Sequence, residues 1–203
     1  MPVAVAAAVA ALGDTRQRHH GDSPMLKTVV IAVAAAIAVV VAGILLYATT
    51  RPDSFSVQRT ATIRAPADRV FMLINDFHRW GEWSPWEKLD PAMKRTFGGP
   101  AAGPGSSYEW TGNSKVGAGR MEILKATPAS KVDIQLDFIK PFEGHNITEF
   151  TLTPQGPNTE VRWLMHGPAP FVTKLMGVFA SMDAMIGKDF EAGLSNLKNA
   201  AEK

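Results

Sequence analysis

The fold class follows from one segment, Val132-Asp-Ile-Gln-Leu-Asp-Phe138. Its apolar side chains stand at every second position, and polar side chains fill the positions between them. Because successive side chains of a β-strand point to opposite faces, one face of this strand is expected to be buried and the other to be in water. That arrangement is typical of an antiparallel sheet.

Turn signals on both sides of this strand divide the neighbouring sequence into similar segments. Clusters rich in glycine and proline occupy residues 98–105, 127–130 and 154–158. We therefore predict six consecutive strands, at residues 94–97, 106–111, 119–126, 131–139, 145–153 and 159–166. A further strand at residues 55–64 precedes them, followed by a helix that starts near Pro66 and a short helical or irregular segment at residues 77–86.

The C-terminal segment, residues 171–201, has the periodicity of one long helix. Apolar side chains recur there at steps of three and four residues, from Phe171 to Leu197. A helix of this length would span about 45 Å, which is enough to lie across a sheet. The predicted class is α+β, with a curved antiparallel sheet packed on a long C-terminal helix.

Three sequence motifs, together with this order of elements, resemble those of a known family. They are Ile63-Arg-Ala-Pro-Ala-Asp-Arg-Val-Phe71, Asn75-Asp-Phe-His-Arg-Trp-Gly-Glu-Trp-Ser-Pro-Trp86 and Tyr108-Glu-Trp-Thr-Gly-Asn113. Over residues 54–200 the chain resembles the polyketide cyclase/dehydrase and lipid-transport branch of the START/Bet v 1-like (SRPBCC) superfamily. The resemblance implies a helix-grip fold, with a hydrophobic cavity between sheet and helix. It also implies binding of lipids, sterols, polyketides or other apolar molecules, and in a minority of members cyclisation or dehydration.

If Phe138 and the strand side chains of the same parity face inward, they would line such a cavity, together with two tryptophans before the sheet and four side chains of the C-terminal helix that face them. From the sheet and the preceding segment these are Trp83, Trp86, Tyr108, Trp110, Phe138, Phe150, Trp163 and Met165, and from the C-terminal helix they are Phe179, Met182, Met185 and Ile186. For each of them, ordinary core packing is the alternative. The three tryptophans of residues 80–86 have three readings: a plug under the sheet, a cap on the cavity mouth, or a contact with lipid headgroups.

The N-terminal part contains an uncharged apolar run, Thr28 to Ala48. As a helix this run would span about 30 Å, the thickness of the hydrocarbon core of a bilayer, so we expect a single-pass membrane anchor at residues 28–48. A cleaved signal peptide is the alternative, although no A-x-A site follows the run. Residues 1–24 are expected to be either a disordered extension or a segment upstream of the true start, with the protein itself beginning at Met25.

Composition excludes several classes of function. The chain has no cysteine, and its histidines do not stand at metal-ligand spacings, so neither a metal nor a cofactor is predicted. The formal net charge of +2, without a cluster of lysine and arginine, argues against nucleic acid as a partner. No catalytic residue is predicted.

The sequence therefore favours a membrane-anchored module that binds a lipid or another hydrophobic small molecule. We expect it in a bacterial inner membrane, with the domain on the extracytoplasmic side. One alternative is a cyclase- or aromatase-like enzyme using Glu109, Glu122, His145 or His166, with Tyr108 as hydrogen-bond donor. Strict alternation places three of these, Glu109, Glu122 and His166, on the wet face. A second alternative is a scaffold for an unidentified protein partner, its interior filled by its own side chains.

Overall fold

The computed structural model of the chain describes residues 24–203. The prediction for residues 1–24 therefore falls almost wholly outside the described residues. The chain divides into two units between Gly43 and Ile44, and each is described by itself.

The N-terminal unit contains most of helix α2 (Pro24–Thr49). Its residues 25–43 are exposed, and the stretch Met25–Thr49 is long and apolar enough to cross a membrane. A signal sequence near the N-terminus can also be this long and apolar. The predicted apolar helix is thus present, and both interpretations of it stay open.

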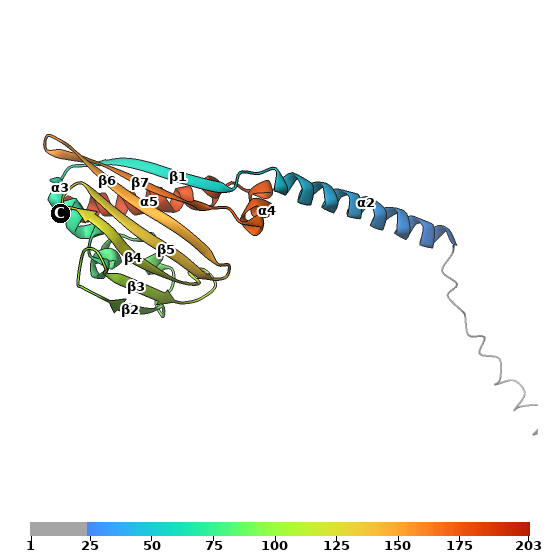
Figure 1. Cartoon of the computed structure of the whole chain (residues 1–203), viewed down its shortest axis with the longest axis horizontal. Coiled ribbons are helices and arrows are strands. Elements are labelled where there is room, and N and C mark those ends of the chain that lie inside the picture. The colour runs from blue at the N-terminus through green and yellow to red at the C-terminus, as the bar shows by residue number, and fades with distance from the viewer. Residues whose placement is uncertain (1–23) are drawn as a thin grey trace, which may run out of the picture. The chain divides into compact units, whose positions relative to one another are not determined.

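The second unit is built on one antiparallel sheet, shown in Figure 1. Within residues 24–203 the strand order is β1-β7-β6-β5-β4-β3-β2. The strands are β1 (Ser54–Ile63), β2 (Lys94–Gly98), β3 (Ser107–Thr111), β4 (Ala118–Thr127), β5 (Lys131–Lys140), β6 (Gly144–Gln155) and β7 (Asn158–Pro168). All seven predicted strands are confirmed to within two residues at each end.

Two short segments and a helix connect β1 to β2. Helix α3 (Ala67–Ile74) has Asp68 in its first turn, where a carboxylate is favourable, and it buries Val70, Leu73 and Ile74. Two 3₁₀ turns follow, η1 (Phe77–Glu82) and η2 (Pro85–Lys88). The predicted helical or irregular segment at residues 77–86 is thus a pair of short 3₁₀ turns.

The C-terminal segment differs from the prediction of one helix. It forms α4 (Phe171–Phe179) and α5 (Met182–Ala201), because the backbone is extended at Ala180 and Ser181. The Ser181 hydroxyl accepts a hydrogen bond from the Ala184 N–H and caps the start of α5. Only α5 grips the sheet, and α4 contributes no buried side chain.

The strand register aligns inward-facing side chains in rows across the sheet. One row runs from Val57 through Met165, Thr148 and Ile134 to Ile123, and the next from Arg59 through Trp163 and Phe150 to Val132. We call the face with these rows the inner face, because its apolar side chains are buried against α3 and α5.

Arg59 joins the sheet to the first half of α5. Its guanidinium donates to both carboxylate oxygens of Asp183, at 2.6 and 3.1 Å, and to Glu191 at 2.7 Å. Gly187 makes room for this group, since a Cβ there would lie 2.1 Å from the Arg59 Nη2 atom. The start of α5 is thereby held against β1.

Two glycines of α5 are expected to differ in how much their replacement by alanine lowers the melting temperature. A Cβ at Gly193 would lie 2.7 Å from Cζ3 of Trp163, whose indole is packed flat on Phe190. We expect Gly193→Ala to lower the melting temperature, because overpacking costs about 1–3 kcal/mol and outweighs the helix-propensity gain of about 1 kcal/mol. At Gly187 a Cβ would displace the Arg59 guanidinium, which ends a flexible side chain and can shift, so Gly187→Ala should lower the melting temperature less than Gly193→Ala. Equal effects of the two variants would contradict this packing.

Candidate functional site

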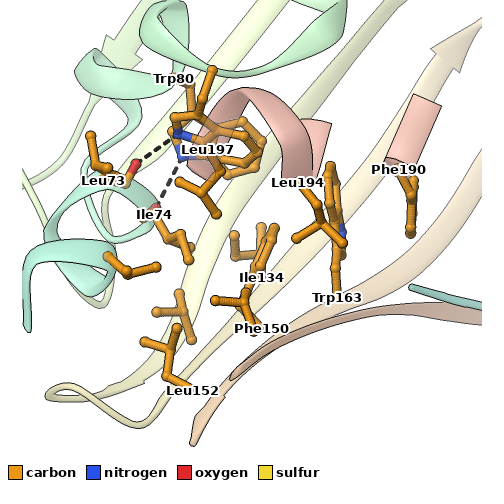
Figure 2. Close-up of a cluster of buried hydrophobic side chains, with 14 of the residues drawn as sticks. Leu73, Ile74, Trp80, Ile134, Phe150, Leu152, Trp163, Phe190, Leu194 and Leu197 are labelled. Carbon is orange, nitrogen blue, oxygen red and sulfur yellow. Dashed lines mark hydrogen bonds between the residues drawn. The ribbon is translucent and has the colours of Figure 1, made fainter. Parts of the chain in front are cut away.

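The inner face of the sheet has two parts that differ in how completely they are covered. Its closed half lies where α3 packs on β5, β6 and β7 and on α5, and it is shown in Figure 2. The side chains there are almost fully buried: Leu73, Ile74, Trp83, Val132, Phe150, Leu152, Val161, Leu194 and Leu197. The chain itself fills this half.

Tryptophans account for much of this filling. The Trp80 and Trp83 indoles donate to the Ile74 and Leu73 carbonyls, at 3.0 and 2.9 Å, which ties η1 to α3 (Figure 2). Trp163 stacks on Phe190, with 4.1 Å between ring centroids. Trp80 and Trp83 thus pack under the sheet, which corresponds to the plug among the three interpretations of this segment.

The other part, which we call the open half, surrounds the beginning of α5. It lies at the edge where β1 begins and β5 ends. Its apolar side chains are only half-buried: Phe55, Trp86, Trp110, Leu136, Phe138, Met182 and Ile186. Water therefore reaches apolar surface on the inner face of this half.

The twelve side chains expected to line a cavity have three different positions. Five are buried in the packed core: Trp83, Tyr108, Phe150, Trp163 and Met165. Five are half-buried beside it: Trp86, Trp110, Phe138, Met182 and Ile186. Phe179 and Met185 are exposed, by 74% and 40%, because the break at Ala180 and Ser181 ends the helical phase that would have turned them inward.

Two polar side chains on the inner face of β6 were not foreseen. Asn146 and Thr148 have the same parity as Phe150 and Leu152, and all four are buried. The alternation of β6 already places both residues on the inner face, but only the apolar residues of that parity were chosen as candidates for the site. Within residues 24–203, the Thr148 hydroxyl oxygen and the Trp163 indole nitrogen make no hydrogen bond, although both are buried.

Tyr108 has a polar end in the otherwise apolar interior. Its hydroxyl donates to Glu87 at 2.5 Å, and Arg95 donates to the other carboxylate oxygen of Glu87 at 2.7 Å. Burial, followed by the bond to Glu87, raises the pKa of Tyr108 far above its usual range. The phenol is therefore a neutral donor engaged with Glu87.

This environment predicts how the protein responds to alkali. A raised pKa in the folded state means that the stabilisation is complete below about pH 10 and is lost as the pH rises towards the folded value. The chain has two tyrosines, so Tyr47→Phe leaves Tyr108 as the sole one. In that variant, phenolate absorbance should rise only as the circular dichroism of the sheet is lost. Ionisation near pH 10 with the sheet intact would contradict the buried contact with Glu87.

The other acid–base candidates lie on the outer face. Glu109 and Glu122 are both paired with Arg120, at 3.4 and 2.7 Å. His145 contacts Asp137 at 2.7 Å, and this pair is also on the outer face.

His166 lies on the same outer face and contacts Glu149 at 3.0 Å. A hydrogen bond from Lys131 is the main cause of a lowered pKa of Glu149. The structure therefore does not bring these histidines and carboxylates to the inner face.

Two hollows are found at the surface of the second unit. One, of about 330 Å³, lies between η1, η2 and β2 and is lined by Phe77, His78, Gly81, Glu87, Lys88, Arg95 and Phe97. The other, of about 620 Å³, is lined chiefly by outward-facing residues of β1, β5, β6 and β7, His145 and His166 among them. None of the twelve predicted side chains lines either hollow. In the described part of the chain, no group of three potential metal ligands comes together.

Several solved structures share this fold at low sequence identity. A solution structure from Thermobifida fusca superposes with a TM-score of 0.55 at 18% identity, covering 70% of this chain and 90% of that one. The crystal structure of the di-domain ARO/CYC BexL from the BE-7585A biosynthetic pathway gives a TM-score of 0.54 at 16% identity, covering 88% of this chain and 61% of that one. The Aha1 dimer from Colwellia psychrerythraea gives 0.52 at 18% identity, covering 73% and 96%.

Sequence comparison identifies a family but no individual relative. No curated protein matches the chain. The family model described as polyketide cyclase / dehydrase and lipid transport matches residues 54–202, which is most of the chain and includes every strand of the sheet. With the helix-grip architecture now described, the chain belongs to the polyketide cyclase / dehydrase and lipid-transport family.

Proposed function

We propose that the chain is a membrane-anchored module that binds a lipid or another hydrophobic small molecule in the open half of the inner face. Family membership supports a hydrophobic-ligand-binding or cyclase role. The similarity in fold to an aromatase/cyclase di-domain is in keeping with either role. Binding is the role that the positions of the polar groups favour.

The half-buried apolar surface around the start of α5 is the observation that carries this proposal. Trp86, Trp110 and Phe138 present aromatic surface to water there, and Met182 and Ile186 at the start of α5 are half-buried as well. Removing apolar surface from water is favourable by about 25 cal/mol per Å². An apolar molecule lying between these side chains would supply that stabilisation. Methionine is suited to such a wall, because its unbranched side chain adapts to different shapes.

The distribution of titratable groups supports binding over catalysis. A general acid or base must come within hydrogen-bond reach of the reacting atom. The candidates Glu109, Glu122, His145 and His166 are on the outer face, and Tyr108 is already bonded to Glu87. A ligand in the open half would meet mainly apolar side chains.

Helix α2 supplies the proposed anchor. Its length and composition suit a membrane span, and four residues, 50–53, connect it to β1. The site would thereby be kept near a membrane, where apolar molecules are concentrated. Anchoring in a bacterial inner membrane, with the domain on the extracytoplasmic side, belongs to this proposal. Alkaline extraction of membranes tests it: the full-length chain should stay in the pellet, whereas a soluble product lacking residues 1–48 would identify a signal peptide.

Analysis of bound small molecules tests the binding function. The full chain is purified from its own membranes in a non-ionic detergent and extracted with organic solvent, and the extract is examined by mass spectrometry. A peptide of residues 24–50, treated in the same way, reports molecules that merely coat α2. We expect an apolar molecule enriched with the full chain over the peptide. Identical extracts, together with no uptake of any added apolar ligand, would contradict the proposal.

A further inference from the structure

Helix α4 presents an apolar face that is left open to solvent within residues 24–203. Val172, Met176 and Phe179 follow each other at steps of four and three residues, so they share one side of the helix. All three side chains are exposed, Phe179 by 74%, and Phe171 beside them is exposed too. None of the residues of α4 is buried. Contiguous apolar surface of this kind marks a place of contact with a partner or a membrane.

The one charged side chain of α4 stands on the opposite side of the helix and is already paired. Lys174 donates to the Asp53 carboxylate at 2.5 Å, and only 14% of its side chain is exposed. Ala169, which precedes the helix, donates its N–H to the Asp53 carbonyl at 2.7 Å. The start of α4 is therefore fixed beside Asp53, and its apolar face carries no charge.

A further exposed aromatic side chain lies at the same end of the sheet. Phe142 belongs to the turn between β5 and β6 and is 58% exposed. In Figure 1 this turn and α4 both lie at the end of the sheet where β1 begins. We call the apolar face of α4 together with Phe142 the contact patch.

The short connection to α2 limits how far the contact patch can lie from a membrane. Helix α2 has 26 residues, so it is about 39 Å long and extends beyond a hydrocarbon core of about 30 Å into the headgroup region. The four residues 50–53 follow it, and they reach at most about 14 Å when fully extended. Asp53 is the last of them and holds the start of α4. When α2 spans a bilayer, the first turn of α4 is therefore within reach of the headgroups.

The size of the contact patch favours a lipid surface over a protein partner. The nine residues of α4 form a helix about 13 Å long and about 10 Å across. A stable protein interface needs about 800 Å² from each partner, which is several times the area of one side of such a helix. Lipid sets no such requirement, because a helix at the membrane surface needs only an apolar face that enters the boundary of the acyl chains by about 5–10 Å.

From these observations we infer that the contact patch docks on the surface of the bilayer that holds α2. The inference rests on the proposed function, because it requires the anchor. It goes further in assigning α4 and Phe142 a membrane contact of their own, separate from the span. The edge of the sheet where β1 begins would then face the lipid.

Spin labels at single cysteines test the inference in a bilayer. The chain has no cysteine, so each introduced one is the sole labelling site. The full chain is reconstituted at high dilution in phosphatidylcholine vesicles. Electron paramagnetic resonance then measures how often the label collides with oxygen, which concentrates in lipid, and with a nickel chelate, which is supplied in the water on both sides.

Three labelled variants are compared. Ile37→Cys reports the span, Val172→Cys the contact patch, and Leu124→Cys a site on β4 towards the other end of the sheet. Val172 and Leu124 are matched controls, because they are 45% and 44% exposed. We expect oxygen collisions to exceed nickel collisions for the labels at Ile37 and Val172, and the reverse for the label at Leu124.

A second substitution tests whether the apolar face causes the docking. Phe179→Ser in the Val172→Cys chain removes a large apolar side chain from the contact patch. The ratio of docked to free molecules should then fall roughly tenfold or more, and the label should become open to nickel. Leu124→Ser in the same chain should leave the label in lipid.

The outcomes separate the inference from the anchor. If the Ile37 label lies in lipid while the Val172 label is as open to nickel as the Leu124 label, the inference is wrong and the anchor stands. If the Val172 label is shielded from oxygen and nickel alike, a protein surface such as a second copy covers it, and the inference is also wrong. If the Ile37 label itself lies in water, the anchor of the proposed function fails, and the inference fails with it.

Discussion

Replacing Trp83 with alanine is expected to lower the free energy of unfolding by about 3–5 kcal/mol. Its side chain is fully buried and lies edge-to-face with both Phe150 and Trp163. The substitution also leaves the Leu73 carbonyl without the indole donor that it accepts from in the closed half. Since whole domains are typically stable by about 5–15 kcal/mol, this variant should melt far below the wild type or fail to fold.

A surface variant of the adjoining helix is the matched control for Trp83→Ala. Met72 lies on α3 next to Leu73 but is 51% exposed, so Met72→Ala should change stability by less than about 0.5 kcal/mol. Thermal melting followed by circular dichroism measures both. A loss below about 1 kcal/mol in Trp83→Ala would mean that the closed half is not the dry, packed plug described above.

Placing a lysine at Leu136 is expected to weaken binding of an apolar ligand by tenfold or more. Leu136 is half-buried in the open half, opposite Asn146 on β6 and Met121 on β4. A ligand lying over the new ammonium group would have to remove it from water, which is costly for a charge without a partner. The fold should survive, because the long side chain can extend to solvent when no ligand is present.

A second lysine variant on the same strand controls for charge and for strand propensity. Ile139 on β5 is 55% exposed, and Ile139→Lys should bind ligand as the wild type does. Titration with 2-undecanone in detergent compares the three chains. Equal affinities for Leu136→Lys and Ile139→Lys would place the ligand away from the open half.

The sheet could be predicted from the sequence because its strands follow a simple alternation. Val132, Ile134 and their neighbours on other strands repeat at every second residue, and glycine- and proline-rich turns mark the ends. Local signals of this kind require no knowledge of distant partners. They were sufficient for the strand boundaries and for the inward parity of most aromatic residues.

The break between α4 and α5 was missed although a local signal for it existed. Apolar side chains continue through Phe179 and Met182 at helical spacing, and this periodicity outweighed the cap. Ser181 followed by Asp183 is the beginning of a helix in its own right: the hydroxyl accepts from a free N–H, and the carboxylate is favourable in the first turn. The helical periodicity alone therefore predicted one helix where the structure has two.

The polar groups of the site depend on contacts that no local pattern contains. Arg59 shares the inward parity of Val57, and its partners Asp183 and Glu191 are more than one hundred residues away along the chain. Thr148 and Trp163 become neighbours only through the register of β6 and β7. Such positions follow from tertiary packing, so they appear only once the strands are paired.

Photolabelling of the full chain tests the central claim most directly. A long-chain ketone carrying a diazirine is equilibrated with the protein in detergent and irradiated, and the labelled residues are located by mass spectrometry. Labels on α2 report only contact with the detergent phase. We predict labels at the open half, on Leu136, Phe138, Met182 or Ile186, that are lost in Leu136→Lys and competed by 2-undecanone. Labels confined to α2 and the outer face, unchanged in that variant, would contradict the account.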